Sequence, residues 1–292
     1  MKVIVTGGAG FIGSHTVKAF IEKGYEAVVV DNLSTGSLKN IDRGNTVFYY
    51  CDVRDRDTLA YIFKNEAPDY LLHLAAQKSV INSVESPWED AEVNIIGTIN
   101  VLSVFHGKRI VFSSSGGAVY GEPLYLPVDE MHPLNPISPY GISKCCAEMY
   151  VESSKTPYTI LRYANVFGLG QTNDAITIFS EKMKRGETPV IYGDGSKIRD
   201  YVHISDAVKA NLLAIETGID GIFNIGSGDP FSDRMIYDHI ASYLNFEKSP
   251  EFAPFRDGEI RHIYLDCRKA EREFSWKAGD CRLLFDEVVL KE

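Results

Sequence analysis

Tyr140 and Lys144 lie four residues apart, and this spacing places both side chains on one face of a helix. A lysine ammonium beside a phenol lowers the pKa of the phenol, so the pair can supply a base that takes a proton from an alcohol. The spacing alone is common in a chain with this many tyrosines and lysines. Its position carries the argument, because the predicted helix follows a predicted strand that ends in Ser113-Ser114-Ser115.

The turn Thr6–Gly13 is a second candidate site, because a glycine recurs there at every third position. Gly7 and Gly10 allow the backbone to turn sharply and approach a pyrophosphate, and Gly13 allows a helix to pack closely on a strand. The next predicted strand ends in Asp31, where a carboxylate can accept hydrogen bonds from an adenosine ribose. Since Asp31 would repel a 2′-phosphate, the pattern favours NAD over NADP.

Asp52 follows the third predicted strand and has two interpretations. Its carboxylate can reach the adenine amino group of a dinucleotide, or it can cap the N-terminus of the following helix. The sequence does not decide between them.

The elements that must position these residues form an α/β pattern. Short apolar runs alternate with helical patterns over the first 165 residues, which predicts a doubly wound parallel sheet of the Rossmann type. We expect strands at Lys2–Thr6, Ala27–Asp31, Val47–Cys51, Tyr70–Leu74, Arg109–Ser113 and Thr159–Arg162. We expect helices at Phe11–Lys23, Thr58–Asn65, Pro87–Phe105 and Pro139–Ser153.

Beyond about Gly168 the alternation loosens into Gly and Pro turns. A hairpin is expected around Gly193-Asp194-Gly195, and helices near Ser205–Thr217 and Ser232–Leu244. We therefore predict an NAD-binding domain over residues 1–168 and a smaller mixed α/β substrate lobe over residues 169–292, with some segments crossing between the two.

The bulk composition excludes several classes of protein. A chain of 292 residues with 45% hydrophobic side chains predicts a folded globular protein, and a net charge of −10 argues against nucleic-acid binding. No apolar stretch is long enough to span a bilayer, and the apolar start of the chain is too short for a signal peptide, so we expect a cytoplasmic protein without a membrane partner. The five cysteines and seven histidines show no metal-ligand spacing, so no metal site is expected.

The chain resembles the extended short-chain dehydrogenases/reductases, in the branch of NAD-dependent nucleotide-sugar epimerases and dehydratases. The resemblance covers nearly the whole length and is carried by segments that occur in family order. They are TGGAGFIG at 6–13, HLAAQ at 73–77, VNIIGT at 93–98, SSS and VYG within 113–121, SPYGISK at 138–144, RYANVFG at 162–168 and RDYVHISD at 199–206.

The resemblance implies that Tyr140 accepts the proton of a sugar hydroxyl and that Lys144 binds the nicotinamide ribose and tunes the phenol. The residues expected at the cofactor are Gly7, Gly10, Phe11, Ile12, Gly13, Asp31, Asn32, Asp52, Val53, Leu74, Ala75, Ala76, Lys78, Asn94, Ser113, Tyr140 and Lys144. The residues expected at the substrate are Ser115, Tyr140, Asn165, Arg199 and Arg256, the last three at the diphosphate of the nucleotide.

The hydroxyl donor that the family places beside its tyrosine departs from the pattern here. Counting back from Val119 without a gap puts Gly116 at the usual Ser/Thr position. We expect Ser115 to serve instead; an extra residue in the motif, or another donor such as Ser114, are the alternatives.

The same stretch discriminates between reactions. Dehydratases and decarboxylating relatives carry acids just before the V-Y-G element, whereas this chain has Gly116, Gly117 and Ala118. Without an acid to drive elimination, epimerisation at C4 through a transient 4-keto sugar is the more economical reaction. We predict a 4-epimerase with tightly bound NAD that acts on UDP-glucose and UDP-galactose or their N-acetyl forms.

Three other expectations accompany this one. A uronate epimerase or a 4,6-dehydratase of the same family is the alternative enzyme, and a non-catalytic NAD-binding sensor is the alternative from another class. The resemblance also implies a homodimer formed through the helices near residues 87–105 and 139–153.

Overall fold

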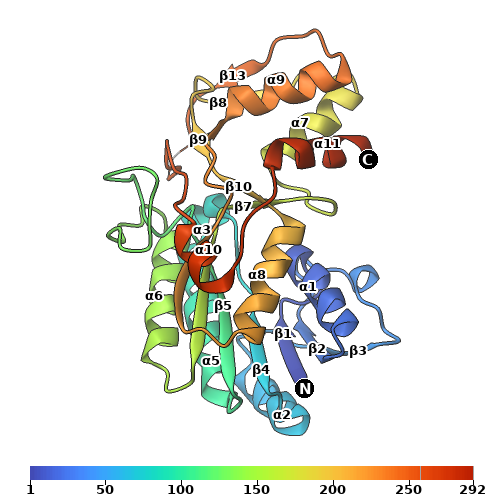
Figure 1. Ribbon diagram of the computed structural model, residues 1–292, viewed down its shortest axis with the longest axis vertical. Coiled ribbons are helices and arrows are strands. Elements are labelled where there is room, and N and C mark those ends of the chain that lie inside the picture. The colour runs from blue at the N-terminus through green and yellow to red at the C-terminus, as the bar shows by residue number, and fades with distance from the viewer. Residues whose placement is uncertain (257, 292) are drawn as a thin grey trace.

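The computed structural model describes residues 1–256 and 258–291 of the chain (Figure 1). Its centre is a seven-stranded parallel sheet in the order β11-β6-β5-β4-β1-β2-β3. The strands are β1 (Lys2–Thr6), β2 (Glu26–Asp31), β3 (Thr46–Tyr50), β4 (Tyr70–His73), β5 (Arg109–Ser115), β6 (Tyr158–Tyr163) and β11 (Gly221–Ile225). The predicted Rossmann-type sheet is confirmed.

The strand order reverses beside β1. From β1 the chain moves outward to β2 and β3, then returns to place β4 on the other side of β1. In open parallel sheets such a reversal opens a crevice at the carboxyl ends of the two strands, where ligands bind. The loops after β1 and β4 meet at this point.

The inner strands are buried on both faces because their side chains alternate between two cores, whereas the edge strand β3 is partly exposed. Val3 and Val5 of β1 contribute to one hydrophobic cluster, and Ile4 contributes to the other. Helices α1 (Phe11–Glu22), α8 (Ile204–Glu216) and α10 (Arg268–Phe274) supply buried side chains to the first cluster, whereas α2 (Arg56–Glu66), α5 (Gly97–Val104) and α6 (Pro139–Ser153) supply the second.

Residues 80–104 are helical but irregular. The chain forms α3 (Val80–Glu85), α4 (Pro87–Ala91), a π-helical turn η2 (Glu92–Ile96) and α5 without a break after Pro87. The helix predicted from Pro87 is therefore present, with one turn wound more loosely. A π turn shifts the side chains that follow it, and such turns are frequent at functional sites.

The upper part of the molecule holds a third hydrophobic cluster built mainly by α7 (Ala175–Lys184), α9 (Asp233–Leu244) and α11 (Cys281–Lys291) (Figure 1). Three short strand pairs lie with it: β7 (Asn165–Phe167) with β10 (Tyr201–His203), β8 (Val190–Tyr192) with β13 (Glu251–Ala253), and β9 (Ile198–Arg199) with β12 (Phe231–Ser232).

The hairpin expected around Gly193-Asp194-Gly195 is wrong. β8 and β9, which flank this turn, pair with β13 and β12 and not with each other. Gly193 and Gly195 do adopt positive φ, which explains why the sequence looks like a hairpin turn.

The two parts of the chain are interleaved. β11 lies far beyond residue 168 but pairs with β6 in the main sheet, and α8 packs against α1. The division of the chain at residue 168 stays a prediction, and segments 204–225 and 268–276 cross it to pack with the main sheet.

Candidate active site

The backbone that follows β1 lies directly against the backbone that follows β4, and a glycine allows this close approach. Gly7 has φ of +71°, and a Cβ on it would lie 2.7 Å from the backbone nitrogen of Ala75. A Cβ on Gly13 would lie 2.2 Å from the carbonyl oxygen of Gly7. Both positions therefore require glycine, and the crevice floor between the two strands is backbone alone.

The N-terminus of α1 faces this crevice without a side-chain cap. Its N-cap is Gly10, and no acidic residue lies in its first turn. The first N–H groups of a helix have no intrahelical partner, so the backbone N–H groups of Phe11 and Ile12 are available to a phosphate. The glycines and this open helix end fit a dinucleotide pyrophosphate.

Asp31 holds the glycine turn from the end of β2. Its Oδ2 accepts a hydrogen bond from Ala9 N at 2.9 Å, and its Oδ1 accepts one from Leu33 N at 2.7 Å. A carboxylate oxygen has a further lone pair, so the buried Asp31 can still accept from ribose hydroxyls. This arrangement fits the expected ribose contact.

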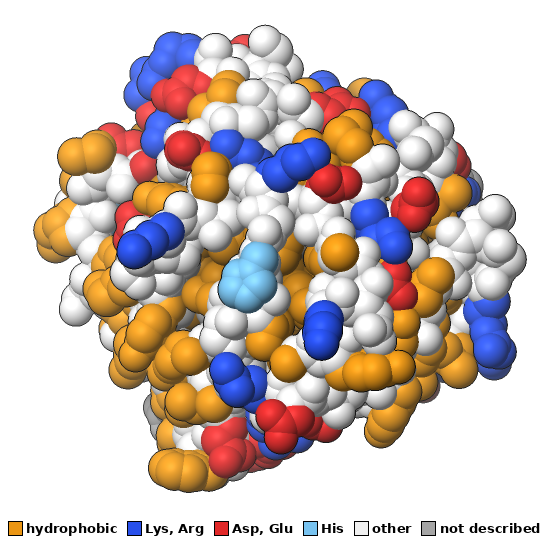
Figure 2. Space-filling model, turned by 90° about the horizontal axis from the view of Figure 1, so that it is seen from below, with side chains coloured by type: hydrophobic (Ala, Val, Ile, Leu, Met, Phe, Trp, Pro, Cys, Tyr) orange, Lys and Arg blue, Asp and Glu red, His pale blue; other side chains and the backbone are white. Residues whose placement is uncertain are grey.

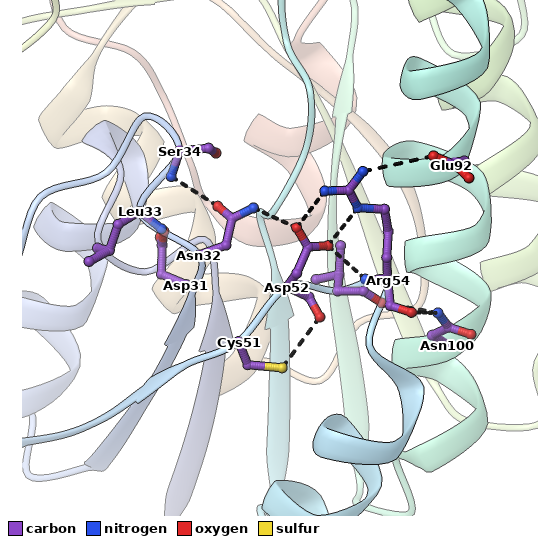
Figure 3. A network of polar contacts seen from close by, with 10 residues as sticks. Asp31, Asn32, Leu33, Ser34, Cys51, Asp52, Arg54, Glu92 and Asn100 are labelled. Carbon is purple, nitrogen blue, oxygen red and sulfur yellow. Dashed lines mark hydrogen bonds and ion pairs between the residues drawn. The ribbon is translucent and has the colours of Figure 1, made fainter.

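Asp52 is the centre of a polar network at the ends of β2 and β3 (Figure 3). Asn32 Nδ2 donates to Asp52 Oδ2 at 2.7 Å, and Arg54 contacts both carboxylate oxygens, Oδ1 through Nε at 2.9 Å and Oδ2 through Nη2 at 2.8 Å. Arg54 lowers the pKa of Asp52 to about 2. Asp52 does not cap the following helix, because Asp55 caps α2 by accepting from Thr58 N.

The catalytic pair lies at the start of α6. Ser138 caps this helix by accepting from Gly141 N, so Tyr140 sits in its first turn and Lys144 follows one turn later. Lys144 is buried, and its Nζ lies 4.4 Å from the centre of the Phe112 ring. Burial lowers the pKa of Lys144 to about 8 and raises the pKa of Tyr140 to about 12.

This finding corrects one part of the expected electrostatics. Burial outweighs every favourable contact of the phenol, so the protein alone does not make Tyr140 a phenolate near neutral pH. A further positive charge beside Tyr140 is needed for that.

Ser114 and Ser115 face different partners. The Ser115 hydroxyl lies close enough to the Tyr140 phenol to lower its pKa. The Ser114 hydroxyl is buried and donates to Glu148 Oε1. The geometry therefore brings Ser115 to the phenol and leaves Ser114 in the core.

Glu148 belongs to a buried network that the sequence analysis missed. Arg162 donates to both of its carboxylate oxygens, at 3.0 Å and 2.6 Å, and also to the Tyr120 hydroxyl at 2.9 Å. The network ties α6 to β5 and β6 behind the catalytic pair. Its sequence signal is spacing, because Tyr140, Lys144 and Glu148 recur every fourth residue on one helical face.

The Asn94 side chain connects the loop after β4 to α4. The amide is buried and accepts from Gln77 N at 3.0 Å, and it donates to Gln77 O at 2.9 Å and to Asp90 Oδ1 at 3.0 Å. The expected contact of Asn94 with a cofactor stays a prediction. Its side chain holds the loop after β4, which contains the expected residues Leu74, Ala75, Ala76 and Lys78.

The remaining residues that were predicted to contact the cofactor lie in different environments. Val53 is buried in the second hydrophobic cluster, so its side chain serves the core. Ser113 is partly buried on β5, two residues before the end of the strand. Lys78 is exposed beside the β4 loop.

Asn165 and Arg199 are brought together at the predicted substrate end. Both line a small cavity of about 10 Å³ whose other walls are Gly116, Gly117, Ala164, Asp200, Ile263 and Leu265. A Cβ on Gly117 would meet only Ser115 Oγ at 3.9 Å and Asn165 Oδ1 at 4.0 Å. The space above Gly117 is therefore open beside the serine that contacts Tyr140.

Arg256 lies in a neighbouring cluster and does not line that cavity. Its guanidinium is 3.5 Å from the centre of the Tyr192 ring, and its Nη1 is 3.7 Å from Glu259 Oε1. Glu259 also accepts from Lys197 Nζ at 3.0 Å. The Arg256 side chain remains 38% exposed.

Another cavity, of about 560 Å³, lies away from all these residues. It is lined by the ends of α2 and α5 that precede the amino ends of β4 and β5, and Figure 2 shows this end of the molecule from below. A pocket at the amino ends of the strands is opposite to the crevice, so volume alone does not identify the site.

Within residues 1–256 and 258–291, no group of three or more His, Cys, Asp or Glu side chains could hold a metal ion. Among the same residues, no helix is both long and apolar enough to cross a membrane.

Comparisons with known proteins agree with this geometry. A family model described as the NAD dependent epimerase/dehydratase family matches residues 3–226. The UDP-glucose 4-epimerase of Mycolicibacterium smegmatis is 36% identical over 293 residues, which cover 95% of this chain and 93% of that protein.

Two solved structures are similar over almost their whole length. A UDP-glucose 4-epimerase from Thermotoga maritima, crystallised with UDP-glucose, has a TM-score of 0.94 at 41% identity and covers 99% of this chain and 97% of its own. The UDP-glucose 4-epimerase of Thermus thermophilus in complex with NAD has a TM-score of 0.92 at 35% identity and covers 100% of both chains.

Proposed function

Since the chain belongs to the NAD-dependent epimerase/dehydratase family, we propose that it inverts C4 of a nucleotide-diphosphate sugar with NAD held in the crevice between β1 and β4. The substrates that we favour are UDP-glucose and UDP-galactose or their N-acetyl forms. The observation that carries the proposal is the placement of Tyr140, Lys144 and Ser115 at the carboxyl end of β5, beside the dinucleotide crevice.

The residues that hold the cofactor are those at the crevice. The open N-terminus of α1 binds the pyrophosphate, and Asp31 binds the adenosine ribose. NAD held there would supply the acceptor and later the donor of the C4 hydride, and its positive ring would supply the charge that the Tyr140 phenol lacks.

Tyr140 moves the proton. Its oxygen takes the proton of the C4 hydroxyl as the alcohol is oxidised to a ketone, and returns it when the ketone is reduced. Ser115 hydrogen-bonds both the phenol and the sugar oxygen, which keeps the transferred proton on a short path. Lys144 stays buried one helical turn after Tyr140. Its ammonium binds the nicotinamide ribose and favours the ionised phenol.

Inversion requires that the sugar turn while its nucleotide stays bound. Arg199 and Arg256 hold the diphosphate by charge-assisted hydrogen bonds, and Asn165 lies next to Arg199 at the small cavity. The open space above Gly117 lies beside Ser115, where the sugar ring must rotate. Reduction of the other face of the ketone then gives the epimer.

The same geometry argues for epimerisation over elimination. Gly116, Gly117 and Ala118 provide no acid or base next to Ser115. Gly116 is also closed to larger residues, because a Cβ there would lie 2.7 Å from Leu265 Cδ1. A dehydratase would need a second proton donor at this point.

The test is a direct assay of interconversion. The purified protein with NAD is incubated with each of the four sugars, and the products are separated by chromatography. We expect the C4 epimer of at least one sugar to form, and Tyr140→Phe to retain NAD without activity. A stable 4-keto-6-deoxy product would identify a dehydratase, and NAD binding without turnover of any sugar would identify a sensor.

We also propose that the enzyme works in the cytoplasm as a homodimer. The outer faces of α4–α5 and α6 carry exposed apolar side chains, namely Trp88, Ile96, Ile142, Met149 and Tyr150. An apolar patch of this kind on neighbouring helices is typical of a subunit interface. We expect Met149→Glu to give a monomer by light scattering, whereas Leu283→Glu, at another exposed apolar position on α11, leaves the dimer intact.

A further inference from the structure

Asp90 is a carboxylate that the proposed mechanism does not use, and it is fully buried. Its Oδ1 accepts hydrogen bonds from Gln77 Nε2 at 2.9 Å and from Asn94 Nδ2 at 3.0 Å. Its Oδ2 has no hydrogen bond of good geometry among the described residues. Burial raises the pKa of the carboxyl, and the nearby Ser143 hydroxyl and the Lys144 ammonium oppose that shift. A buried carboxylate with an unsatisfied oxygen is costly and calls for an explanation.

The position of Asp90 joins three parts of the active site. It lies at the end of α4, next to the π turn that carries Asn94. Gln77 belongs to the loop after β4, and Ser143 precedes Lys144 on α6. One side chain thus connects the wall of the dinucleotide crevice to the catalytic helix.

The charges around Lys144 do not balance without Asp90. Glu148 also lies near the ammonium, but Arg162 pairs with it through both oxygens and offsets its charge. No ion pair among the described residues contains Asp90, so Lys144, which follows Ser143 on α6, favours the ionised carboxylate from beyond ion-pair distance. His73, the other titratable group beside Lys144, is buried and stays neutral, since burial lowers its pKa to about 3.

We propose that Asp90 is the counter-charge of Lys144, keeping the ammonium charged in the dry interior and fixing the loop after β4 through Gln77 and Asn94. Asp90 is a positioning residue, because it acts through Lys144 and the loop without touching substrate. The inference rests on the proposed function for the role of Lys144, but the pairing of the two charges is a property of the chain itself.

The pairing has opposite consequences for the two catalytic groups. A negative charge at Asp90 raises the pKa of Lys144, which opposes the effect of burial, and it also raises the pKa of Tyr140. Asp90→Asn keeps the shape of the side chain and its acceptor for Gln77 and Asn94 but removes the charge. Both pKa values should therefore fall, by roughly one unit for charges separated by a few ångströms in a protein interior.

The first experiment measures the phenol without turnover. The absorbance of phenolate is titrated in the cofactor-free protein, and the curve of Tyr140→Phe is subtracted from that of the wild type to isolate Tyr140. The same subtraction is made with Asp90→Asn and the double variant Asp90→Asn/Tyr140→Phe. We expect the resulting titration curve of Tyr140 to lie at lower pH than in the wild type. Glu66→Gln, a carboxylate bonded to Tyr49 and Lys2 far from the site, is the matched control and should not shift the curve. Superimposable curves for Asp90→Asn and wild type would overturn the proposal.

The second experiment is a double-mutant cycle on stability, which also requires no activity. Asp90→Asn should lower the melting temperature of the wild type, because it leaves Lys144 unpaired. In the Lys144→Met background the same change should raise the melting temperature, because it removes an uncompensated buried carboxylate. Equal shifts in both backgrounds would show that the two residues are independent.

The third experiment uses the active holoenzyme. We expect the alkaline limit of kcat/KM to move to lower pH in Asp90→Asn and to return in Asp90→Glu, which restores the charge. If no sugar is epimerised, the proposed function fails while the first two experiments still decide the role of Asp90.

Discussion

The Ser115 hydroxyl lies close to the Tyr140 phenol and lowers its pKa, while the adjacent Ser114 donates to Glu148 in the buried core. Successive residues of a strand point to opposite faces of the sheet, so only one of the two hydroxyls can reach the phenol. The chemical role and the structural role are thereby divided between neighbours of the same residue type, and substitution can separate them.

Ser115→Ala should lower kcat by about 10²-fold, because the proton on the sugar oxygen loses its hydrogen-bonded path to Tyr140. The melting temperature should change little, since Ser115 is only partly buried. Steady-state kinetics of epimerisation give the first quantity and calorimetry the second.

Ser114→Ala serves as the matched variant and should behave in the reverse way. It leaves Glu148 short of a buried hydrogen bond, which costs about 1–3 kcal/mol of unfolding free energy. Its kcat should remain within a few-fold of the wild type. A larger loss of kcat in Ser114→Ala than in Ser115→Ala would contradict the assignment.

Gly7→Ala should abolish NAD binding, and Gly24→Ala should not. Both glycines have positive φ, +71° and +82°, so both substitutions carry the same backbone strain. Only Gly7 has backbone of the β4 loop within 2.7 Å of the new Cβ, whereas nothing lies within 4 Å at Gly24. We expect Gly7→Ala to lose about 2 kcal/mol more stability than Gly24→Ala.

The check on this pair is titration with NAD followed by calorimetry, together with urea unfolding of both variants. If Gly7→Ala retained NAD with unchanged affinity, the crevice between β1 and β4 would not be the cofactor site.

The charge of Lys144 should limit activity on the alkaline side. Burial lowers its pKa to about 8, so the ammonium is present below that pH and is lost as the pH rises through about 8. Because the ammonium favours the ionised phenol and binds the ribose, kcat/KM should fall above about pH 8. A profile that rises steadily to pH 10 would rule out this role.

Lys144→Arg provides the comparison. A guanidinium stays charged throughout this range, so the NAD affinity of the variant should not depend on pH between 7 and 9. The wild type should lose affinity over the same interval, as measured by equilibrium dialysis.

Removal of one partner of the Glu148–Arg162 pair should lower the free energy of unfolding far more than removal of both partners. Both side chains are buried, and Glu148→Met would leave the Arg162 guanidinium without a counter-charge at a cost of about 3–5 kcal/mol. The double variant Glu148→Met/Arg162→Met should recover part of that loss. Urea unfolding of the three variants measures the coupling, and additive losses would contradict it.

The sequence by itself determined much of the fold because the relevant signals are local. Helix α6 begins at Pro139 and ends at Ser153, as predicted, since Ser138 and Pro139 are strong signals for a helix start. The parallel sheet followed from alternating apolar runs and helical patterns, and the positions of Gly7 and Gly13 followed from the turn between β1 and α1.

Only the tertiary structure decided which side chains meet across long stretches of chain. The strand β11 completes the main sheet from beyond residue 220, and Asp90 approaches Lys144 although the two lie far apart in the sequence. Counting back from Val119 favoured Ser115, but Ser114 has the same type and an adjacent position, so the count left both open. The packing of β5 between β4 and β6 fixes which of its faces meets α6, and this contact assigns one serine to the phenol and the other to the core.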